Sequence, residues 1–247
     1  MLTRRILLGT AAATAVLLAT AIPSMADKVV VGHSQPNLGW PYIAAVTNIL
    51  EAEAKKHPDV ELVTLSADGD IAKQSSDISS LVNRKVNVLL VTSLDGNAVI
   101  PALKQAADAG IPILAVSNEP AEAGQALLAA YSGPDDYVQG VIAAELLHEA
   151  LGGQGGIAII EGSPGQSTTL LRTQGLKDRL AELKSGITIL GAQTADWNPV
   201  KAKDVAQAFL TAYGDQLRGV FEEDDNSGVA AAVVFNDVGR GVFKVVG

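Results

Sequence analysis

Side chains able to act as catalytic groups or metal ligands are few and scattered in this sequence. Its three histidines, His33, His57 and His148, form no metal-binding motif with one another. His33 ends the first apolar run, where a histidine either lines a pocket or has a structural role. The chain has no cysteine and no G-x-S-x-G motif, which excludes thiol catalysis, disulfides and that serine nucleophile. We therefore expect no catalytic residue, no cofactor and no metal site.

Two further segments share some features with phosphate-binding and calcium-binding loops. The glycine-rich segment 162–168 follows an apolar run and opens a helical pattern, as a phosphate loop would, but it lacks the lysine and spacing of such loops. The four carboxylates Glu222, Glu223, Asp224 and Asp225 lack the alternate spacing of a calcium loop. They are interpreted either as a solvated strand end or as a run in which one or two side chains face a ligand cleft.

Two tryptophans stand out in a chain that is only 4% aromatic. Trp40 and Trp197 each lie between a predicted strand and a predicted helix, one in each half of the chain. In open α/β sheets, ligands bind at the carboxyl ends of the strands. An indole ring with Asn and Asp neighbours suits a sugar, whose apolar face stacks on the ring while polar neighbours bind its hydroxyls. We interpret the two tryptophans as parts of a ligand pocket. The alternative is that each only packs its helix against its sheet.

The elements that would position these residues alternate regularly. Short β-branched apolar runs without polar alternation are typical of parallel strands covered on both faces, and they fall at 28–32, 61–65, 86–91, 111–116, 156–160, 187–190, 218–221 and 242–246. Apolar stripes at helical spacing lie between them, for example Val138, Ile142 and Leu146. This rhythm predicts an α/β fold with doubly wound parallel sheets.

The rhythm restarts near residues 131–134 without a long linker. We therefore expect two lobes joined by chain crossovers, an N-terminal lobe over residues 27–131 and a C-terminal lobe over 132–247.

The first 26 residues have the pattern of a secretory signal peptide. Arg4 and Arg5 precede an uncharged run to Ile22, and Ser24-Met25-Ala26 is a small-x-small cleavage signature. The alternative, a membrane anchor, is disfavoured by a short run diluted with threonine. We expect cleavage after Ala26, and the paired arginines are compatible with the twin-arginine route. Removing both arginines and no acid takes the net charge from −9 to −11, which argues against a nucleic-acid partner.

Several segments resemble the ribose-binding-protein group of periplasmic receptors, the type I periplasmic binding proteins, which share their fold with the ligand-binding part of LacI-type repressors. The matches, in order along residues 30–231, are 30–42, 70–90, Ala109-Gly110-Ile111-Pro112-Ile113, 161–176, 193–197 and 221–231. The resemblance implies two lobes that close on a monosaccharide or polyol, delivery to the permease of an ABC importer, a periplasmic monomer and no catalysis. It implies ligand contacts at or near Asn37, Trp40, Tyr42, Ser117, Asn118, Ser167, Thr168, Trp197 and Asp224.

Departures from the group's pattern bear on the ligand. Ser117 and Asn118 stand where the group often has Asp-Arg, Leu170 stands at an arginine position, and Asp224 replaces an asparagine. Two charge-assisted hydrogen-bond sites are thereby lost, and the carboxylate of Asp224 only accepts hydrogen bonds. We expect a polyol, an aldose or an amino sugar, and not an anion.

The group continues after the strand that ends near Gly247 and crosses back to complete the first lobe. We therefore expect the 247-residue chain to be a C-terminally truncated form whose first lobe lacks its last elements. The leading interpretation is the periplasmic receptor of an ABC importer. The alternatives are a sugar-sensing receptor for chemotaxis or a two-component system, an exported α/β enzyme, and a DNA-binding repressor, which the signal peptide and the negative charge disfavour.

Overall fold

The apolar runs of the first half form one parallel sheet. The computed structural model describes residues 28–237 and 244–246, so the predicted signal peptide and its cleavage site lie outside the described residues. The strand order is β2-β1-β3-β4-β5, with every neighbouring pair parallel. The strands are β1 (Val29–Gln35), β2 (Val60–Ser66), β3 (Val88–Val91), β4 (Ile113–Val116) and β5 (Ala130–Ser132).

The second half forms a separate parallel sheet in the order β7-β6-β8-β9. Its strands are β6 (Gln154–Glu161), β7 (Gly186–Thr194), β8 (Leu217–Glu222) and β9 (Lys244–Val246). All eight predicted runs therefore coincide with strands, although the last, predicted over 242–246, is described only from Lys244. The α/β fold with two parallel sheets is confirmed.

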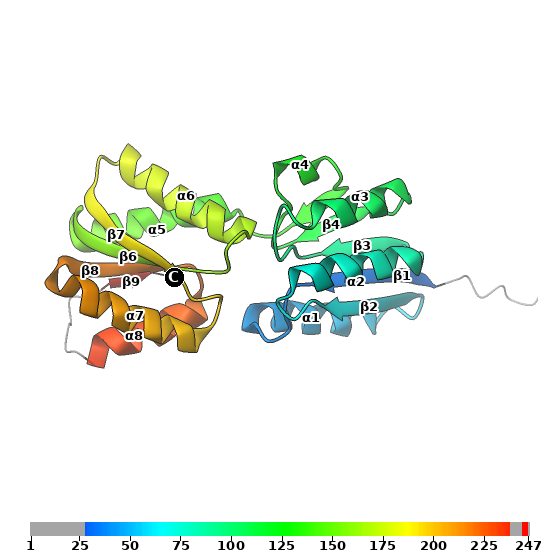
Figure 1. Cartoon of the computed structure of the whole chain (residues 1–247), viewed down its shortest axis with the longest axis horizontal. Helices are drawn as coiled ribbons and strands as arrows, with labels where there is room; N and C mark the ends of the chain where they lie inside the picture. Colours follow the sequence, from blue (N-terminus) through cyan, green and yellow to red (C-terminus); the bar gives the residue numbers. More distant parts are fainter. Residues whose placement is uncertain (1–27, 238–243, 247) are drawn as a thin grey trace, which may run out of the picture.

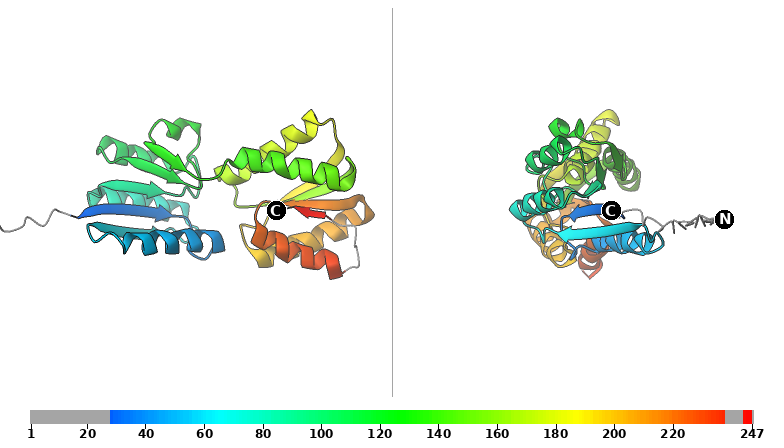
Figure 2. Two further views of the ribbon diagram at one scale, coloured as in Figure 1. Left: turned by 180° about the vertical axis from the view of Figure 1, so that it is seen from behind. Right: turned by 90° about the vertical axis from the view of Figure 1, so that its right-hand side faces the viewer.

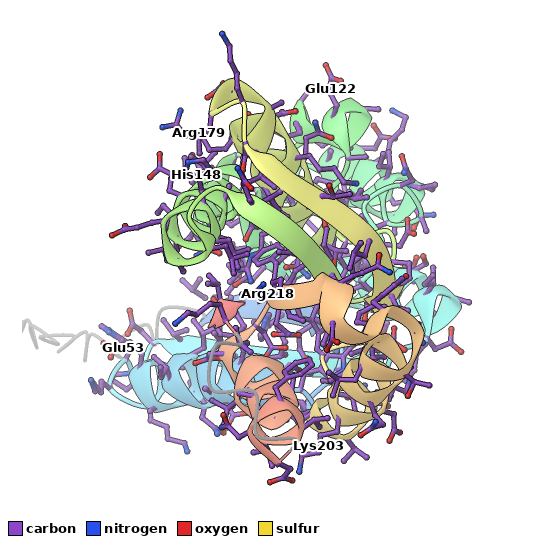
Figure 3. The ribbon with its side chains drawn as sticks, turned by 90° about the vertical axis from the view of Figure 1, so that its left-hand side faces the viewer. Glu53, Glu122, His148, Arg179, Lys203 and Arg218 are labelled. Carbon is purple, nitrogen blue, oxygen red and sulfur yellow. The ribbon has the colours of Figure 1, made fainter. Side chains whose placement is uncertain are left out.

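Helices cover the sheets because each crossover between parallel strands must return along a sheet face. In the first lobe α1 (Pro41–Ala54) lies on one face, opposite α2 (Ile71–Asn83) and α3 (Ile100–Asp108), with the short α4 (Glu122–Gln125) following (Figure 2). In the second lobe α5 (Asp136–Leu151) and α6 (Ser167–Glu182) cover one face, and α7 (Pro199–Tyr213) and α8 (Asp225–Asp237) cover the other (Figure 3). A 3₁₀ turn, η1 (Gly214–Gln216), leads into β8.

The described residues form three apolar clusters. One is shared by the first sheet, α2 and α3, and includes Ile78, Leu103 and Ile113. The other two lie on opposite faces of the second sheet, one under α7 and α8 and one under α5 and α6. Each lobe is therefore stabilised by its own core. In the described residues no helix is long and apolar enough to span a membrane.

Helices α5 and α6 approach each other through two reciprocal glycines. A Cβ at Gly140 would lie 2.0 Å from the carbonyl oxygen of Arg172, and one at Gly175 would lie 2.1 Å from that of Tyr137. Both distances are far inside van der Waals contact, so only glycine permits this approach. The close packing fixes α5 and α6, and with them Asp136 and Arg172, relative to each other.

The apolar stripe on α5 is not the face that packs on the sheet. The helix is confirmed, but Val138, Ile142 and Leu146 are 45%, 49% and 48% exposed, whereas Ala144 and Leu147 are fully buried. The small residues on the neighbouring stripe allow close contact with α6 and the sheet.

The two lobes lie side by side along the long axis of the molecule (Figure 1). In the described residues the chain passes between them through residues 133–135, after β5 and before α5. Strand β5 was not predicted, and it occupies residues interpreted as the break in rhythm. The lobe boundaries 27–131 and 132–247 stay a prediction.

Candidate functional site

The carboxyl ends of both sheets border one cavity of about 480 Å³ between the lobes. Parallel strands bring their carboxyl ends to one sheet edge, and the loops that follow are free to carry polar side chains. Polar and aromatic lining residues come from both lobes, among them Trp40, Tyr42, Ser117, Asn118, Gln139, Gln166, Thr168, Arg172, Trp197, Glu222, Glu223, Asp224, Asp225 and Asn226. The size and the mixed lining are typical of a small-molecule site.

Trp197 lies on the second-lobe wall in a strained loop between β7 and α7. Asp196 and Trp197 both have left-handed backbones, with φ of 53° and 56°. Such conformations cost roughly 1 to 3 kcal/mol each and persist where the surroundings enforce them. The indole ring lies against the backbone of Gly162, where a Cβ would be 1.9 Å from the ring, and its Nε1 donates to Gln166 Oε1 at 2.7 Å. The ring is thus held in a single orientation at the cavity.

Trp40 and Tyr42 face the cavity from the first lobe. Trp40 precedes α1, and Pro41 at the first helical position favours a helix start there. The hydroxyl of Tyr42 lies 3.0 Å from Ser117 Oγ. Ser117 also has a left-handed backbone, with φ of 62°, and its carbonyl accepts a hydrogen bond from the Tyr131 hydroxyl at 2.9 Å. A second aromatic wall therefore opposes Trp197.

Direct hydrogen bonds join the lobes at one side of the cavity. Thr168 Oγ1 donates to Asn118 Oδ1 at 2.6 Å, and the Glu119 amide donates to Ser167 Oγ at 2.8 Å. The amide of Gly96 donates to the carbonyl of Gly165 at 3.0 Å. All three bonds involve the loop before α6 or its first turn.

Arg172 is the cationic side chain on the cavity wall. Its Nε donates to Asp136 Oδ1 at 2.9 Å, and Nη1 donates to the carbonyl of Glu223. The side chain of Asp136 is only 2% exposed. Burial, partly offset by Arg172, raises the pKa of Asp136.

Two of the four consecutive carboxyl groups are buried, which contradicts the interpretation of the run as a solvated strand end. Glu222 and Glu223 are each 1% exposed, and burial raises the pKa of Glu222 to about 9 and that of Glu223 to about 8. Glu223 accepts hydrogen bonds from the Gly162 amide at 2.8 Å and from Thr173 Oγ1 at 2.9 Å. Glu222 ends β8 and Asp225 begins α8, so the chain turns between them and all four residues border the cavity.

Asp224 holds the start of α8. Its Oδ1 accepts the Ser227 amide at 3.1 Å, while Oδ2 is buried without a hydrogen-bond partner. Its own amide donates to Glu222 Oε2 at 2.6 Å.

Seven of the nine predicted contact residues border the cavity: Trp40, Tyr42, Ser117, Asn118, Thr168, Trp197 and Asp224. Asn37 does not line it, and its Oδ1 accepts the Gly39 amide at 2.8 Å within its own loop. Ser167 does not line it either, and is used in the contact between lobes. Whether any of the nine contacts a ligand stays a prediction.

Gln166 and Arg172 belong to the cavity but were not predicted as contact residues. Both lie in segments that the sequence marks, the glycine-rich loop and the helix after it, yet nothing local distinguishes them from their neighbours. His33 is 1% exposed inside β1 and away from the cavity, and burial lowers its pKa to about 4. Among the described side chains, no group of three or more His, Cys, Asp or Glu is arranged to hold a metal ion.

Comparison with known proteins gives consistent matches. A model of the periplasmic binding protein domain matches residues 31–247. The xylitol-binding protein of Mycolicibacterium smegmatis is 31% identical over 192 residues, 78% of this chain and 54% of that protein. A putative rhizopine-binding protein of Rhizobium meliloti is 28% identical over 236 residues, 95% of this chain and 75% of the relative.

Solved structures agree on the fold. An ABC transporter periplasmic solute-binding protein from Actinobacillus succinogenes, with bound D-allose, superposes with a TM-score of 0.76 at 29% identity, covering 88% of this chain and 77% of that one. A solute-binding protein from Bacillus halodurans with bound myo-inositol has a TM-score of 0.82 at 23% identity, covering 91% and 77%. The chain thus spans about half the length of the xylitol-binding protein and about three quarters of these structures. By its sequence over residues 31–247 and by its fold, the chain belongs to the periplasmic binding protein domain family.

Proposed function

We propose that this protein is the substrate-binding protein of an ABC importer, and that it binds a monosaccharide or related polyol in the cavity between its lobes. The observation that carries the proposal is the cavity itself, with an indole from each lobe at its walls and hydroxyl, amide and carboxyl groups between them. Aromatic rings supply stacking faces for sugar rings, and the polar groups supply partners for hydroxyls.

The same family membership supports a location and a set of partners. We infer export to the periplasm after cleavage behind Ala26, action as a monomer, delivery of the ligand to a membrane permease, and no catalysis. Sequencing the N-terminus of the protein recovered from the periplasm tests the first point, and a start at Asp27 is expected. Recovery of the uncleaved chain in the membrane fraction would contradict it.

Intrinsic tryptophan fluorescence tests the ligand class. Because the chain has two tryptophans, the variants Trp40→Phe and Trp197→Phe each leave one reporter, and both are expected to respond to the same ligand. The panel comprises ribose, allose, xylitol, myo-inositol and the common aldohexoses, with calorimetry as a second readout. Absence of binding to every panel member by both methods, in a chain shown to be folded, would overturn the proposal.

A further inference from the structure

The cavity is lined by more carboxyl groups than a neutral sugar requires. Four carboxyl groups line it, those of Glu222, Glu223, Asp224 and Asp225, and the cationic side chain among its described lining residues is Arg172. Burial raises the pKa of Glu222 to about 9 and that of Glu223 to about 8, so both stay protonated at pH 7, whereas the carboxylates of Asp224 and Asp225 only accept hydrogen bonds. The lining therefore favours a ligand that brings hydrogen-bond donors and positive charge.

The charge of Arg172 is not paired with the carboxylates of Asp224 and Asp225, because its guanidinium group already has other partners. It forms the ion pair with Asp136, which lies outside the cavity lining, and its remaining described hydrogen bond goes to a backbone carbonyl. Within the described residues, no ion pair includes Glu222, Glu223 or Asp224. Because Glu222 and Glu223 are protonated at pH 7, the negative charge that faces the cavity is that of the carboxylates of Asp224 and Asp225.

Among the oxygens of the described lining residues, Asp224 Oδ2 is buried without a hydrogen-bond partner. The other carboxylate oxygen, Oδ1, is used to cap α8. An unpaired buried carboxylate oxygen is costly, and a charged donor compensates it better than a neutral one. A ligand that enters the cavity with an ammonium group supplies such a donor.

A second unpaired group points to hydroxyls on the same ligand. Gln166 is 1% exposed and lines the cavity, its Oε1 is fixed by Trp197 Nε1, and its Nε2 has no hydrogen-bond partner. With the oxygen held by the indole, the amide nitrogen is left to donate to a ligand hydroxyl. The faces of Trp40, Tyr42 and Trp197 suit either part of such a ligand, because they pack against sugar carbons and attract cations.

We propose that the ligand carries a protonated amine together with several hydroxyls, as an amino sugar or amino polyol does, and that the amine binds at Asp224. This inference rests on the proposed function and narrows its ligand class. It assigns Gln166 to a hydroxyl of the same molecule.

The test compares ligands that differ only in the amine. The full chain is titrated at pH 7 with D-glucosamine against D-glucose, D-galactosamine against D-galactose, and 1-amino-1-deoxysorbitol against sorbitol, by tryptophan fluorescence and calorimetry. At least one amine is expected to bind about tenfold or more tighter than its neutral partner, since the amine exchanges a neutral for a charge-assisted hydrogen bond. This comparison needs no variant, so it does not depend on how any substitution folds.

The variant Asp224→Asn locates the effect. Asparagine keeps an oxygen for the Ser227 amide while removing the charge, and it is expected to reduce the amine-to-neutral ratio to near one. The matched control is Asp204→Asn, which removes an exposed carboxylate on α7 outside the cavity lining and is expected to leave the ratio unchanged.

The outcomes separate this inference from the proposed function. Binding of neutral ligands with no preference for any amine would overturn the inference alone. An amine preference that survives in Asp224→Asn would overturn the assignment to Asp224. Absence of binding in both series and to the wider sugar panel would overturn the proposed function, and this inference with it.

Discussion

The variant Glu222→Gln should remove a large part of the pH dependence of folding stability. Glu222 is 1% exposed, and burial, with Asp224 and Glu223 adding repulsion, raises its pKa from 4.5 to about 9. The folded protein therefore keeps this proton up to a much higher pH than the unfolded chain does. Because the folded state binds more protons, the free energy of unfolding falls as pH rises. The loss begins near pH 4.5 and continues until the folded state also ionises near pH 9.

The magnitude follows from the size of the pKa change. Each pKa unit corresponds to about 1.4 kcal/mol, so a rise from 4.5 to about 9 sets an upper limit of about 6 kcal/mol. The carboxyl group borders the cavity, from which water can reach the ionised form, and we expect an observed contribution of about 2 to 4 kcal/mol. Against a typical stability of about 5 to 15 kcal/mol this is a large effect.

The assay is urea unfolding followed by tryptophan fluorescence between pH 5 and pH 9. Glutamine cannot ionise, and its amide oxygen can still accept the Asp224 amide that Glu222 binds at 2.6 Å. The parent is expected to lose stability steeply over this range, and Glu222→Gln is expected to be the more stable of the two at pH 9. Equal pH slopes in the parent and the variant would refute the reasoning, and Asp204→Asn serves as the control for a lost surface carboxylate.

Three further predictions concern packing and the contact between lobes. Gly140→Ala should lower the free energy of unfolding by about 3 kcal/mol or more, because its Cβ would meet the Arg172 carbonyl. Gly110→Ala should lower it by only about 1 to 2 kcal/mol, because the site has open space and the cost comes from its φ of 75°. Urea unfolding measures both. Thr168→Val should cost about 1 to 3 kcal/mol by leaving Asn118 Oδ1 without the hydroxyl that donates to it at 2.6 Å, as judged by thermal unfolding. Tyr131→Phe should cost about 1 to 2 kcal/mol through the loss of the hydroxyl proton that the carbonyls of Ser117 and Pro134 share, and an unchanged melting temperature would contradict this.

The parts of the fold that could be predicted are those with a local signal. Parallel strands covered on both faces must be apolar and favour β-branched residues, so their runs are visible along the chain. Strand β5, with only Ala130–Ser132, is too short to make such a run and exists because β4 offers it an edge. The exposure of the stripe on α5 could not be predicted, because apolar periodicity does not say which of two neighbouring stripes fits against a sheet.

In the candidate site too, the residues that could be predicted are those with a local signal in the sequence. Trp40 and Trp197 could be placed at the cavity because both follow strands at the carboxyl edge of a sheet. The burial of Glu223 could not be predicted, since it depends on the Gly162 amide and Thr173, which lie 61 and 50 residues away in the chain. Asn37 is outside the cavity lining, and its side chain is held within its own loop by a hydrogen bond to an amide only two residues away.

The hydrogen bonds between the lobes make two backbone amides into reporters of opening. The amides of Gly96 and Glu119 belong to the first lobe, but their acceptors, the Gly165 carbonyl and Ser167 Oγ, belong to the second. Their hydrogens can exchange with deuterium when the lobes separate, without either lobe unfolding. Comparing their exchange with that of amides inside β1 and β6 would therefore give the fraction of time the cleft stands open, and a ligand that bridges the cleft would slow exchange at these two positions selectively.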